Sequence, residues 1–294
     1  MKETAWLVYN GGLFTHKFQD YASLMQRAAR LRGVELTTVA NDELLVTTDG
    51  VTPCRSDLAE PAFIHFADKD LPLANALERE GYRLYNRART IELCDDKRLM
   101  HQAFAGYGVP QPLTITAPMA YPKLGYRNTA FCRQAASLLG FPLVVKEAFG
   151  SFGEQVYWVE TMTELEDLVE RLAGVPHLYQ KAVTESFGSD IRINIVGSSP
   201  VAAMKRKAEG FRANVTAGGT TEPYEPSQEE INVAVAAARA VGADMAGVDL
   251  FTGSEQPLVC EINSNPHVRS IIECTGVPVH HTMIEKMLQG RTRI

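Results

Sequence analysis

The chain has 294 residues, of which 45% are hydrophobic and 22% are charged, so it can fold into two or three packed units. Its 35 acidic and 29 basic residues give a formal net charge of -6, and without a basic run this charge disfavours a nucleic-acid partner. No segment has the apolar length of a membrane span, the start lacks a secretory signal pattern, and the five cysteines are scattered. We therefore expect a cytoplasmic protein with reduced cysteines and no membrane partner.

The N-terminal third alternates between strand and helix patterns. Its expected elements, in chain order, are a strand at 6–9, a helix at 18–32, strands at 35–39 and 62–66, a helix at 71–80 and a strand at 82–85. Gly33 follows the first helix at the position of a left-handed cap. This alternation predicts an N-terminal α/β domain, residues 1–93, around a parallel sheet.

The middle of the chain, residues 94–178, combines helix and hairpin signals. Its expected elements are a helix from Asp95 or Asp96 to just before Gly108, strands at 141–146 and 155–159, a helix to about 172 and a strand at 177–183. The two central strands enclose a glycine-containing loop, which predicts a hairpin whose tip can approach a ligand closely. Thr163 and Glu166 have the spacing of a capping box for the second helix.

The last part of the chain, residues 179–294, is rich in alternating strands. Its expected elements are a hairpin of 190–196 and 201–206, a helix to about 241, strands at 247–251 and 257–263, and a closing helix at 279–288. Ser227 and Glu230 form a capping box that starts the first of these helices. Two α+β units therefore follow the α/β domain.

Three oxygen-bearing side chains gather in the last predicted strand pair. If the two strands form an antiparallel hairpin centred near Glu255, Asp249 lies opposite Glu261, and Asn263 shares that face. Oxygen ligands of this kind suit Mg²⁺, which also keeps water and phosphate ligands. The alternative is two solvated acids beside a polar turn.

A second feature is the glycine loop between the central strands. Gly150-Ser151-Phe152-Gly153 follows Lys146, and glycine amides with a nearby ammonium group can cradle a phosphate. A plain hairpin turn has the same appearance. The nucleotide and hydrolase motifs G-x-x-x-x-G-K-[ST], G-x-G-x-x-G, G-x-S-x-G and H-E-x-x-H are all absent.

Basic residues recur near these features, and most such residues merely solvate a surface. Arg192 and Arg206 differ because strand alternation in the predicted hairpin can aim them together. Paired guanidinium groups can neutralise a transferring phosphate or bind a carboxylate.

Read in order, these segments resemble the ATP-grasp superfamily, and most closely its RimK-like ligases. The resemblance covers nearly the whole chain and is carried by Asp96-Lys97, Leu143-Val-Val-Lys146, Gly150-Ser-Phe-Gly153, Tyr179-Gln-Lys-Ala-Val183, Asp190-Ile-Arg192, Phe211-Arg-Ala-Asn214, Ala246-Gly-Val-Asp249 and Val259-Cys-Glu-Ile-Asn263. It implies an ATP-grasp fold: an N-terminal parallel α/β domain followed by two α+β subdomains that clamp ATP. It makes the magnesium and phosphate interpretations the favoured ones.

The resemblance also implies a role for each matching residue. The implied ATP contacts are Lys97 and Lys146 on the phosphates, the loop Gly150, Ser151, Phe152 and Gly153 over them, Lys181 and Ala182 at adenine, Asp190 at the ribose or nucleotide, and Arg212 and Asn214 near the phosphates. The implied magnesium ligands are Asp249, Glu261 and Asn263, with Mn²⁺ as an alternative ion.

The implied reaction joins a carboxylate to an amine. The carboxylate attacks the γ-phosphate of ATP, and an amine captures the resulting acyl phosphate as an amide. Such chemistry needs no protein nucleophile, so the absence of a catalytic triad fits it. We assign Arg206 to the transferring phosphoryl group and Arg192 to a second cationic contact near the acyl phosphate.

The sequence departs from RimK-type glutamate ligases just after the magnesium ligands. Where those enzymes usually continue Asn-x-Ser-Pro-Gly-Leu-Glu, this chain reads Asn263-Ser-Asn-Pro-His-Val-Arg269. His267 and Arg269 are therefore candidate substrate contacts, and the addition of glutamate to a ribosomal protein does not follow.

Two alternatives remain open at this point: a small-molecule kinase on the same fold, and a non-catalytic ATP-binding protein. The retention of all three metal ligands and both phosphate lysines argues against the second. The expected partners are small-molecule or peptide carboxylates and amines, and the resemblance makes a homodimer or homotetramer plausible.

Overall fold

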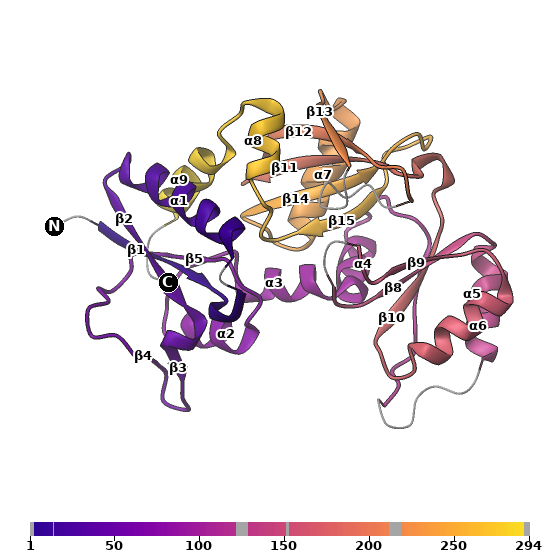
Figure 1. The fold of residues 1–294 in the computed structure, drawn as a ribbon, viewed down its shortest axis with the longest axis horizontal. Helices are drawn as coiled ribbons and strands as arrows, with labels where there is room; N and C mark the ends of the chain where they lie inside the picture. The colour runs from indigo at the N-terminus through magenta and orange to yellow at the C-terminus, as the bar shows by residue number, and fades with distance from the viewer. Residues whose placement is uncertain (1–2, 14, 122–128, 151–152, 212–218, 291–294) are drawn as a thin grey trace.

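The computed structural model describes residues 3–13, 15–121, 129–150, 153–211 and 219–290. They form three lobes (Figure 1): an N-terminal domain at one end, a central lobe with β8, β9 and β10 at the other, and the C-terminal strands between them. Within the described residues, no helix is long and apolar enough to cross a membrane.

The N-terminal domain is built on a parallel sheet in the order β2-β1-β5-β6, as the sequence predicts. Its elements are β1 (Glu3–Tyr9), α1 (His16–Arg30), β2 (Val34–Ala40), the hairpin strands β3 (Leu44–Val46) and β4 (Val51–Pro53), β5 (Ile64–Phe66), α2 (Leu71–Arg79) and β6 (Leu84–Tyr85). Thr15 caps α1 by accepting from the Phe18 amide, and Gly33 follows it with φ of +77°.

The middle of the chain carries a four-stranded sheet in the order β7-β10-β8-β9. Its elements, with the two connecting helices that precede them, are α3 (Ala88–Asp95), α4 (Lys97–Gly106), β7 (Thr114–Thr116), α5 (Ala130–Leu139), β8 (Leu143–Glu147), β9 (Val156–Val159), α6 (Met162–Arg171) and β10 (His177–Lys181). The predicted hairpin of β8 and β9 is confirmed. The predicted cap of α6 is wrong: Thr161, rather than Thr163, accepts from the Glu164 amide.

The C-terminal part carries a five-stranded sheet in the order β13-β12-β11-β14-β15. Its elements are β11 (Ser189–Val196), β12 (Ser199–Lys207), β13 (Thr220–Pro223), α7 (Gln228–Ala240), β14 (Met245–Phe251), β15 (Val259–Asn263), α8 (Arg269–Thr275) and α9 (Val279–Gln289). The capping box of Ser227 and Glu230 is present as predicted.

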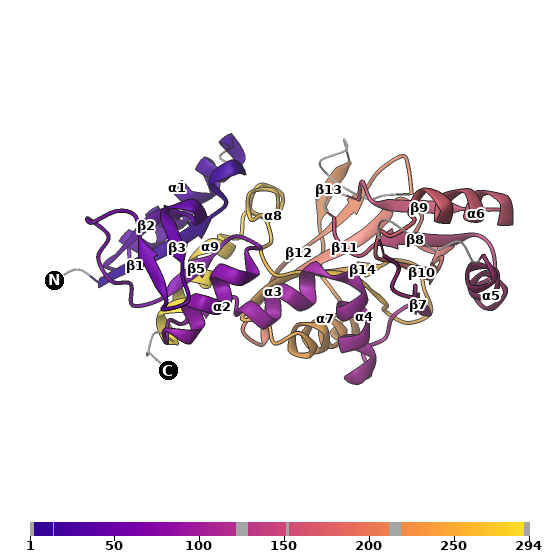
Figure 2. The same ribbon diagram turned by 90° about the horizontal axis from the view of Figure 1, so that it is seen from below.

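The C-terminal helices return to the N-terminal domain. Met283 and Ile284 of α9 belong to the same buried apolar cluster as Met25 and Ala28 of α1. The view from below likewise places α9 in the N-terminal domain, where it packs on α1, while α8 packs on β12 (Figure 2). The buried Asn86 links the two parts by hydrogen bonds, because its side-chain nitrogen donates to the backbone carbonyls of Met245 and Ser264. These contacts fix the N-terminal domain against the C-terminal sheet.

Candidate active site

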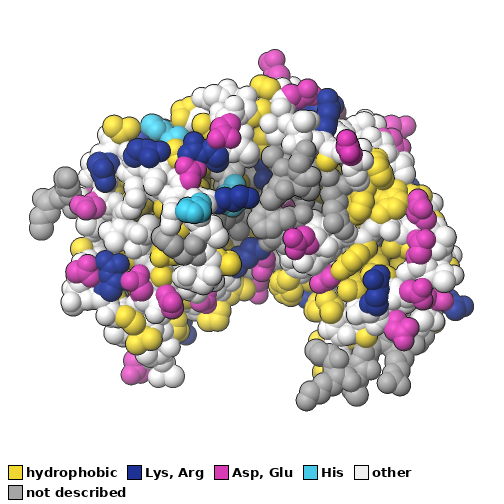
Figure 3. Space-filling view, viewed as in Figure 1, with side chains coloured by type: hydrophobic (Ala, Val, Ile, Leu, Met, Phe, Trp, Pro, Cys, Tyr) yellow, Lys and Arg dark blue, Asp and Glu magenta, His cyan; other side chains and the backbone are white. Residues whose placement is uncertain are grey.

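A cavity of about 660 Å³ is lined by residues of all three lobes. The space-filling view shows a deep notch between the N-terminal domain and the central lobe (Figure 3). The N-terminal domain supplies Tyr9 and Asp68, the central lobe supplies Lys146 and Lys181, and the C-terminal sheet supplies its inward-facing charged residues. Most sequence-predicted site residues that the structure describes therefore line one space.

The predicted register of the last strand pair is confirmed. β14 and β15 pair antiparallel with Asp249 opposite Glu261 and Gly247 opposite Asn263. Val248 and Ile262 point to the other face and are buried in the apolar cluster beneath the sheet. The alternation of the two strands thus delivers the three oxygen-bearing side chains to the cavity.

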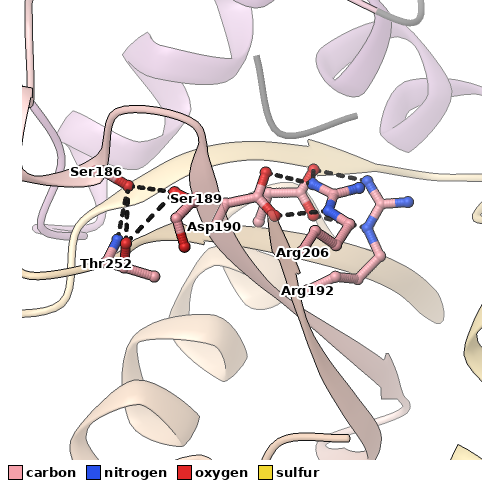
Figure 4. A network of polar contacts seen from close by, with 7 residues as sticks. Ser186, Ser189, Asp190, Arg192, Arg206 and Thr252 are labelled. Carbon is pink, nitrogen blue, oxygen red and sulfur yellow. Dashed lines mark hydrogen bonds and ion pairs between the residues drawn. The ribbon is translucent and has the colours of Figure 1, made fainter. Parts of the chain in front are cut away.

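Two arginines hold the acids of this sheet in a buried ion-pair cluster, which we call the charge cluster: Asp190, Arg192, Arg206 and Asp249 (Figure 4). Arg192 donates to both oxygens of Asp249 at 2.6 Å, and Arg206 donates to both oxygens of Asp190 at 2.6 Å. The Arg206 Nη2 also lies 2.9 Å from Asp249 Oδ2. Two positive charges therefore face two negative charges.

The protonation of the charge cluster follows from this pairing. Burial opposes ionisation of Asp249, but Arg192 and Arg206 outweigh it and lower the pKa of that carboxyl below its ordinary value. Burial and the neighbouring Asp249 raise the pKa of Asp190. The bidentate contact with Arg206 acts in the opposite direction and favours the charged form of Asp190.

Glu261 and Asn263 lie at the edge of the charge cluster. In the orientation of the Asn263 amide that satisfies both neighbours, its nitrogen donates to Glu261 Oε1 at 3.1 Å and its oxygen accepts from Arg192 Nη2 at 3.0 Å. Glu261 is half-buried and faces the cavity. Its carboxylate therefore keeps lone pairs that point to the space in which a ligand would sit.

The donor set fits Mg²⁺, which takes oxygen ligands. Asp249, Glu261 and Asn263 supply two carboxylates and one amide oxygen from adjacent strands. Among the described residues, no three His, Cys, Asp or Glu side chains gather as a metal site, because the third donor here is an amide. Both oxygens of Asp249 already accept from arginine, so a bound ion would share or replace a guanidinium contact.

Two buried lysines frame the glycine loop. The Lys97 ammonium donates to the Gly150 carbonyl at 3.2 Å, and burial lowers its pKa. Lys146 is buried on β8 and lines the cavity, as does Gly153. Gly150 has φ of +146°, a conformation that other residues rarely adopt. Ser151 and Phe152 lie outside the described residues, as do Arg212 and Asn214.

The end of β10 meets an aromatic wall that the sequence did not predict. Lys181 lines the cavity where β10 ends, and Ala182 follows it. The ring of Trp158 packs edge-on against Phe187 with centroids 5.3 Å apart, and Phe211 completes the group. We call Trp158, Phe187 and Phe211 the aromatic wall. The three rings come from separate segments, so no local sequence pattern predicts that they meet.

The two candidate substrate residues have different surroundings. His267 lines the cavity, and burial together with nearby Lys17 and Arg192 lowers its pKa. Arg269 is not among the described residues that line the cavity. Its guanidinium forms a two-pronged ion pair with Asp20 on α1.

Comparison with known proteins agrees with this geometry. Residues 95–287 match the sequence model of the RimK-like ATP-grasp domain. The chain is 33% identical over 216 residues to a probable alpha-L-glutamate ligase 2 of Hahella chejuensis, which covers 72% of this chain and 68% of that protein. It is 35% identical over 219 residues to a probable alpha-L-glutamate ligase of Xanthomonas campestris pv. campestris, covering 73% and 72%.

The fold likeness extends over the whole chain. The structure of the ATP-grasp ligase PsnB, complexed with a phosphomimetic variant of its minimal precursor, Mg and ADP, superposes with a TM-score of 0.70 at 18% identity, over 98% of this chain and 99% of that one. The ATP-grasp fold that the sequence predicts is thereby confirmed. The chain belongs to the RimK-like ATP-grasp family and is an ATP-dependent carboxylate–amine ligase.

Proposed function

We propose that this ligase binds Mg-ATP in the cavity, transfers the γ-phosphoryl group to a substrate carboxylate, and passes the acyl group to an amine. The observation that carries the proposal is the convergence of Lys146, the charge cluster and Glu261 on one cavity. Positioned cations and oxygen ligands are what phosphoryl transfer to a carboxylate requires, and no protein nucleophile is needed.

In this proposal Lys97 and Lys146 hold the ATP phosphates, with Gly150 to Gly153 as the loop over them. Lys97 is buried beside Gly150, so its ammonium is already aimed at that loop. A phosphate bound at this loop would give the buried Lys97 ammonium an ionic partner, which would offset the cost of burying its charge. Arg212 and Asn214 are proposed as further phosphate contacts from the family resemblance.

Magnesium would be held by Asp249, Glu261 and Asn263, with Mn²⁺ as the alternative ion. When bound, the ion supplies charge neutralisation at the transferring phosphoryl group. The presence of Mg and ADP in the PsnB complex supports this ion. The guanidinium groups of Arg192 and Arg206 would then turn from Asp249 toward the transferred phosphoryl group and the acyl phosphate.

The aromatic wall is the proposed adenine site. Its rings offer flat apolar surface. The family resemblance implies that the backbone of Lys181 and Ala182 contacts the adenine. Asp190 would contact the ribose or nucleotide after exchanging a contact with Arg206. The proposed functional units are residues 1–93, 94–178 and 179–294, although β10 of the central sheet runs on to Lys181 and so crosses the second boundary.

The proposed substrates are a small-molecule or peptide carboxylate and an amine. His267 is the proposed substrate contact with the stronger support, because it faces the cavity, whereas Arg269 is held by Asp20. A cytoplasmic location, a homodimer or homotetramer, and the lack of nucleic-acid and membrane partners remain predictions.

The test is phosphate release from Mg-ATP across a matrix of amino acids, dicarboxylates and short peptides. We expect release that requires an acid and an amine together, is lost in Glu261→Ala, and is kept in Glu255→Ala, an exposed control in the loop between β14 and β15. A stable phosphorylated product would instead indicate a kinase, and tight Mg-ATP binding without turnover would indicate a binding protein.

A second variant tests the arginine assignment. Arg206→Ala is expected to lose most of the acid- and amine-dependent turnover while it still binds ATP. Wild-type turnover in this variant would overturn the role of Arg206 at the transferring phosphoryl group.

A further inference from the structure

A buried hydrogen-bond network lies behind one wall of the cavity, between α4, β7 and β10. Its members are His101, Gln111, Thr114 and Gln180. His101 is 4% exposed and Gln180 is 1% exposed, yet Gln180 also lines the cavity. Polar side chains buried in this way cost folding free energy unless each of them is hydrogen-bonded.

A backbone carbonyl at each end of the network fixes the direction of its hydrogen bonds. A carbonyl can only accept, so the Gln111 amide turns its nitrogen to the His101 carbonyl, 3.0 Å away. The Gln111 oxygen then faces His101 Nδ1 at 2.6 Å, so Nδ1 carries the proton and Nε2 is an acceptor. At the other end, the Thr114 hydroxyl donates to the Pro112 carbonyl at 2.9 Å, which leaves Thr114 Oγ1 as an acceptor.

Gln180 lies between these two acceptors. Its side-chain nitrogen donates to Thr114 Oγ1 at 2.9 Å and contacts His101 Nε2 at 3.2 Å as the donor. Both N–H groups of the amide are therefore used, and the amide cannot turn over without losing both bonds. Burial and the nearby Lys146 lower the pKa of His101 to about 3, so the imidazole is neutral and Nε2 stays an acceptor at neutral pH.

The network leaves the carbonyl oxygen of the Gln180 side chain unused. Within the described residues, Oε1 has no hydrogen-bond partner and is not one of the fully buried unpaired atoms. Because Gln180 lines the cavity, a ligand bound there can reach this oxygen. The side chain therefore offers the cavity an acceptor and no donor.

The register of the central sheet aligns Gln180 with the aromatic wall. Gln180 pairs with Val144 on β8, and Val144 pairs with Trp158 on β9, so the three side chains form one row across the sheet. All three line the cavity. Neighbouring strands are about 4.8 Å apart, so about 10 Å separates the outer two strands of the row. A flat base that lies over Val144 and contacts Trp158 would present its other edge to Gln180.

An acceptor at this place distinguishes one purine from another. Adenine has an amino group at position 6, which donates, whereas guanine has an oxygen there, which accepts. Hypoxanthine has the same oxygen. Gln180 Oε1 can accept from the amino group, but it would face the oxygen without a hydrogen bond. Because both N–H groups of Gln180 are used, its amide cannot rotate to offer a donor instead.

We propose that His101 is a positioning residue for nucleotide choice: it holds the Gln180 nitrogen, so that Gln180 Oε1 accepts from the 6-amino group of adenine and disfavours purines with an oxygen at position 6. The inference rests on the proposed function, because it needs the base of ATP to lie between the aromatic wall and Gln180. His101 is not among the described residues that line the cavity, so it acts through Gln180.

The test measures the binding of ATP and of inosine triphosphate (ITP) by calorimetry, with the whole chain and Mg²⁺ and without acid or amine substrates. ITP keeps the sugar and phosphates of ATP and carries an oxygen at position 6. His101→Leu and Thr114→Val each remove one of the two acceptors that hold Gln180.

His177→Leu is the matched control. His177 is also a buried, hydrogen-bonded histidine, but it lies on the opposite face of β10 from Gln180 and is not among the described residues that line the cavity. This variant therefore removes a buried imidazole without releasing the Gln180 amide.

We expect wild-type protein to bind ATP about tenfold or more tightly than ITP, as for one hydrogen bond replaced by an unpaired acceptor. His101→Leu should reduce this preference to less than about threefold because ITP binds more tightly, since the freed amide can donate to its oxygen. Thr114→Val should act in the same direction, and it gives the answer if His101→Leu does not fold. His177→Leu should keep the preference.

Four results would overturn the proposal. They are equal binding of ATP and ITP by wild type, a preference that survives in His101→Leu and Thr114→Val, a preference that falls without any gain in ITP binding, and a preference that is lost in His177→Leu. The third result would indicate general damage to the site, which weakens both nucleotides.

Phosphate release from ATP in the same preparations separates this inference from the proposed function. Release that requires an acid and an amine, together with equal binding of ATP and ITP, leaves the ligase intact and removes the role of His101. A His101-dependent preference for ATP without coupled release keeps the base site and counts against the proposed chemistry. If neither nucleotide binds, the proposed ATP site fails, and this inference fails with it.

Discussion

The charge cluster and Asp68, which follows β5 in the N-terminal domain, are two ways of burying acids beside one cavity. In the charge cluster, Asp190 and Asp249 each accept two hydrogen bonds at 2.6 Å from one arginine. Asp68 accepts hydrogen bonds from Asn10 and the Lys69 amide through Oδ1, but its buried Oδ2 has no partner among the described residues. The first arrangement pairs each buried carboxylate with a guanidinium group, and the second leaves one carboxylate oxygen unpaired among the described residues.

The difference shows which acids are already paired within the protein and which one keeps an unpaired oxygen among the described residues. Removing one member of a buried ion pair strands its partner, whereas removing an unsatisfied carboxylate relieves a cost. The two regions should therefore respond to the same Asp→Asn change with opposite signs.

The largest expected effect breaks the charge cluster. Asp249→Asn leaves Arg192 without its carboxylate and Arg206 with one carboxylate in place of two, so the free energy of unfolding should fall by about 3–5 kcal/mol. Urea unfolding of the variant and of wild type measures this difference in free energy. Removing both charges in Asp249→Asn with Arg192→Met should recover part of the loss. A single variant as stable as wild type would show that the ion pairs are not needed for folding.

Lowering the pH should destabilise the N-terminal domain through a buried histidine that the charge cluster does not contain. His65 donates from Nδ1 to the Tyr85 carbonyl and accepts from the Tyr21 hydroxyl at 2.6 Å, and burial lowers its pKa to about 4. Because the unfolded state binds the proton more readily, this histidine should reduce stability as pH falls from about 6.5 towards 4, by about 2 kcal/mol at pH 5.

The measurement compares urea unfolding at pH 7.5 and pH 5 in wild type and His65→Gln. Trp6 and Trp158 lie in different lobes, so Trp158→Phe leaves Trp6 to report on the N-terminal domain. The variant should lose much of the pH dependence of that signal. Equal pH dependence in the two proteins would mean that other groups cause the acid sensitivity.

A smaller effect of opposite sign sharpens the comparison. Asp68→Asn should increase the free energy of unfolding at pH 7 by about 0.5 kcal/mol, a modest value because solvent reaches one side of this carboxyl. The sign follows from linkage: a carboxyl whose folded pKa is raised costs stability once it ionises. A destabilised Asp68→Asn protein would contradict the view that the oxygen is held at a cost.

The smallest effect is expected at Arg269. Its ion pair with Asp20 is exposed to solvent, and exposed pairs contribute little. Arg269→Ala should leave the unfolding midpoint and the binding of acidic probes unchanged, while His267→Ala should weaken the binding of a substrate. Clear loss of acidic-probe binding in Arg269→Ala would restore Arg269 as a substrate contact.

Local patterns predicted much of the fold because they depend on neighbours in sequence. Strand alternation and one loop centre were enough to place Asp249 opposite Glu261, and the Ser227–Glu230 box marked the start of α7. The cap of α6 failed for the same local reason. Thr161 and Thr163 are each followed three residues later by a glutamate, so the pattern fits two starts equally well.

Features made by distant segments could not be predicted in this way. The aromatic wall joins Trp158, Phe187 and Phe211, and the surroundings of Asp68 depend on Asn10 in another strand. The pairing of Arg192 with Asp249 follows from the register between β11 and β14, two strands far apart in the chain. Burial and hydrogen bonding of this kind are properties of the assembled fold.

The contact between α1 and α9 makes the ligase poorly modular. Met283, Ile284 and Met287 of α9 belong to the RimK-like segment, yet they are buried in the cluster that contains α1. A segment cut at residue 95 would expose this apolar face and lose the anchor of Asn86. Exchanging N-terminal domains between relatives to alter specificity would thus require α1, Asn86 and α9 to be transplanted as one unit.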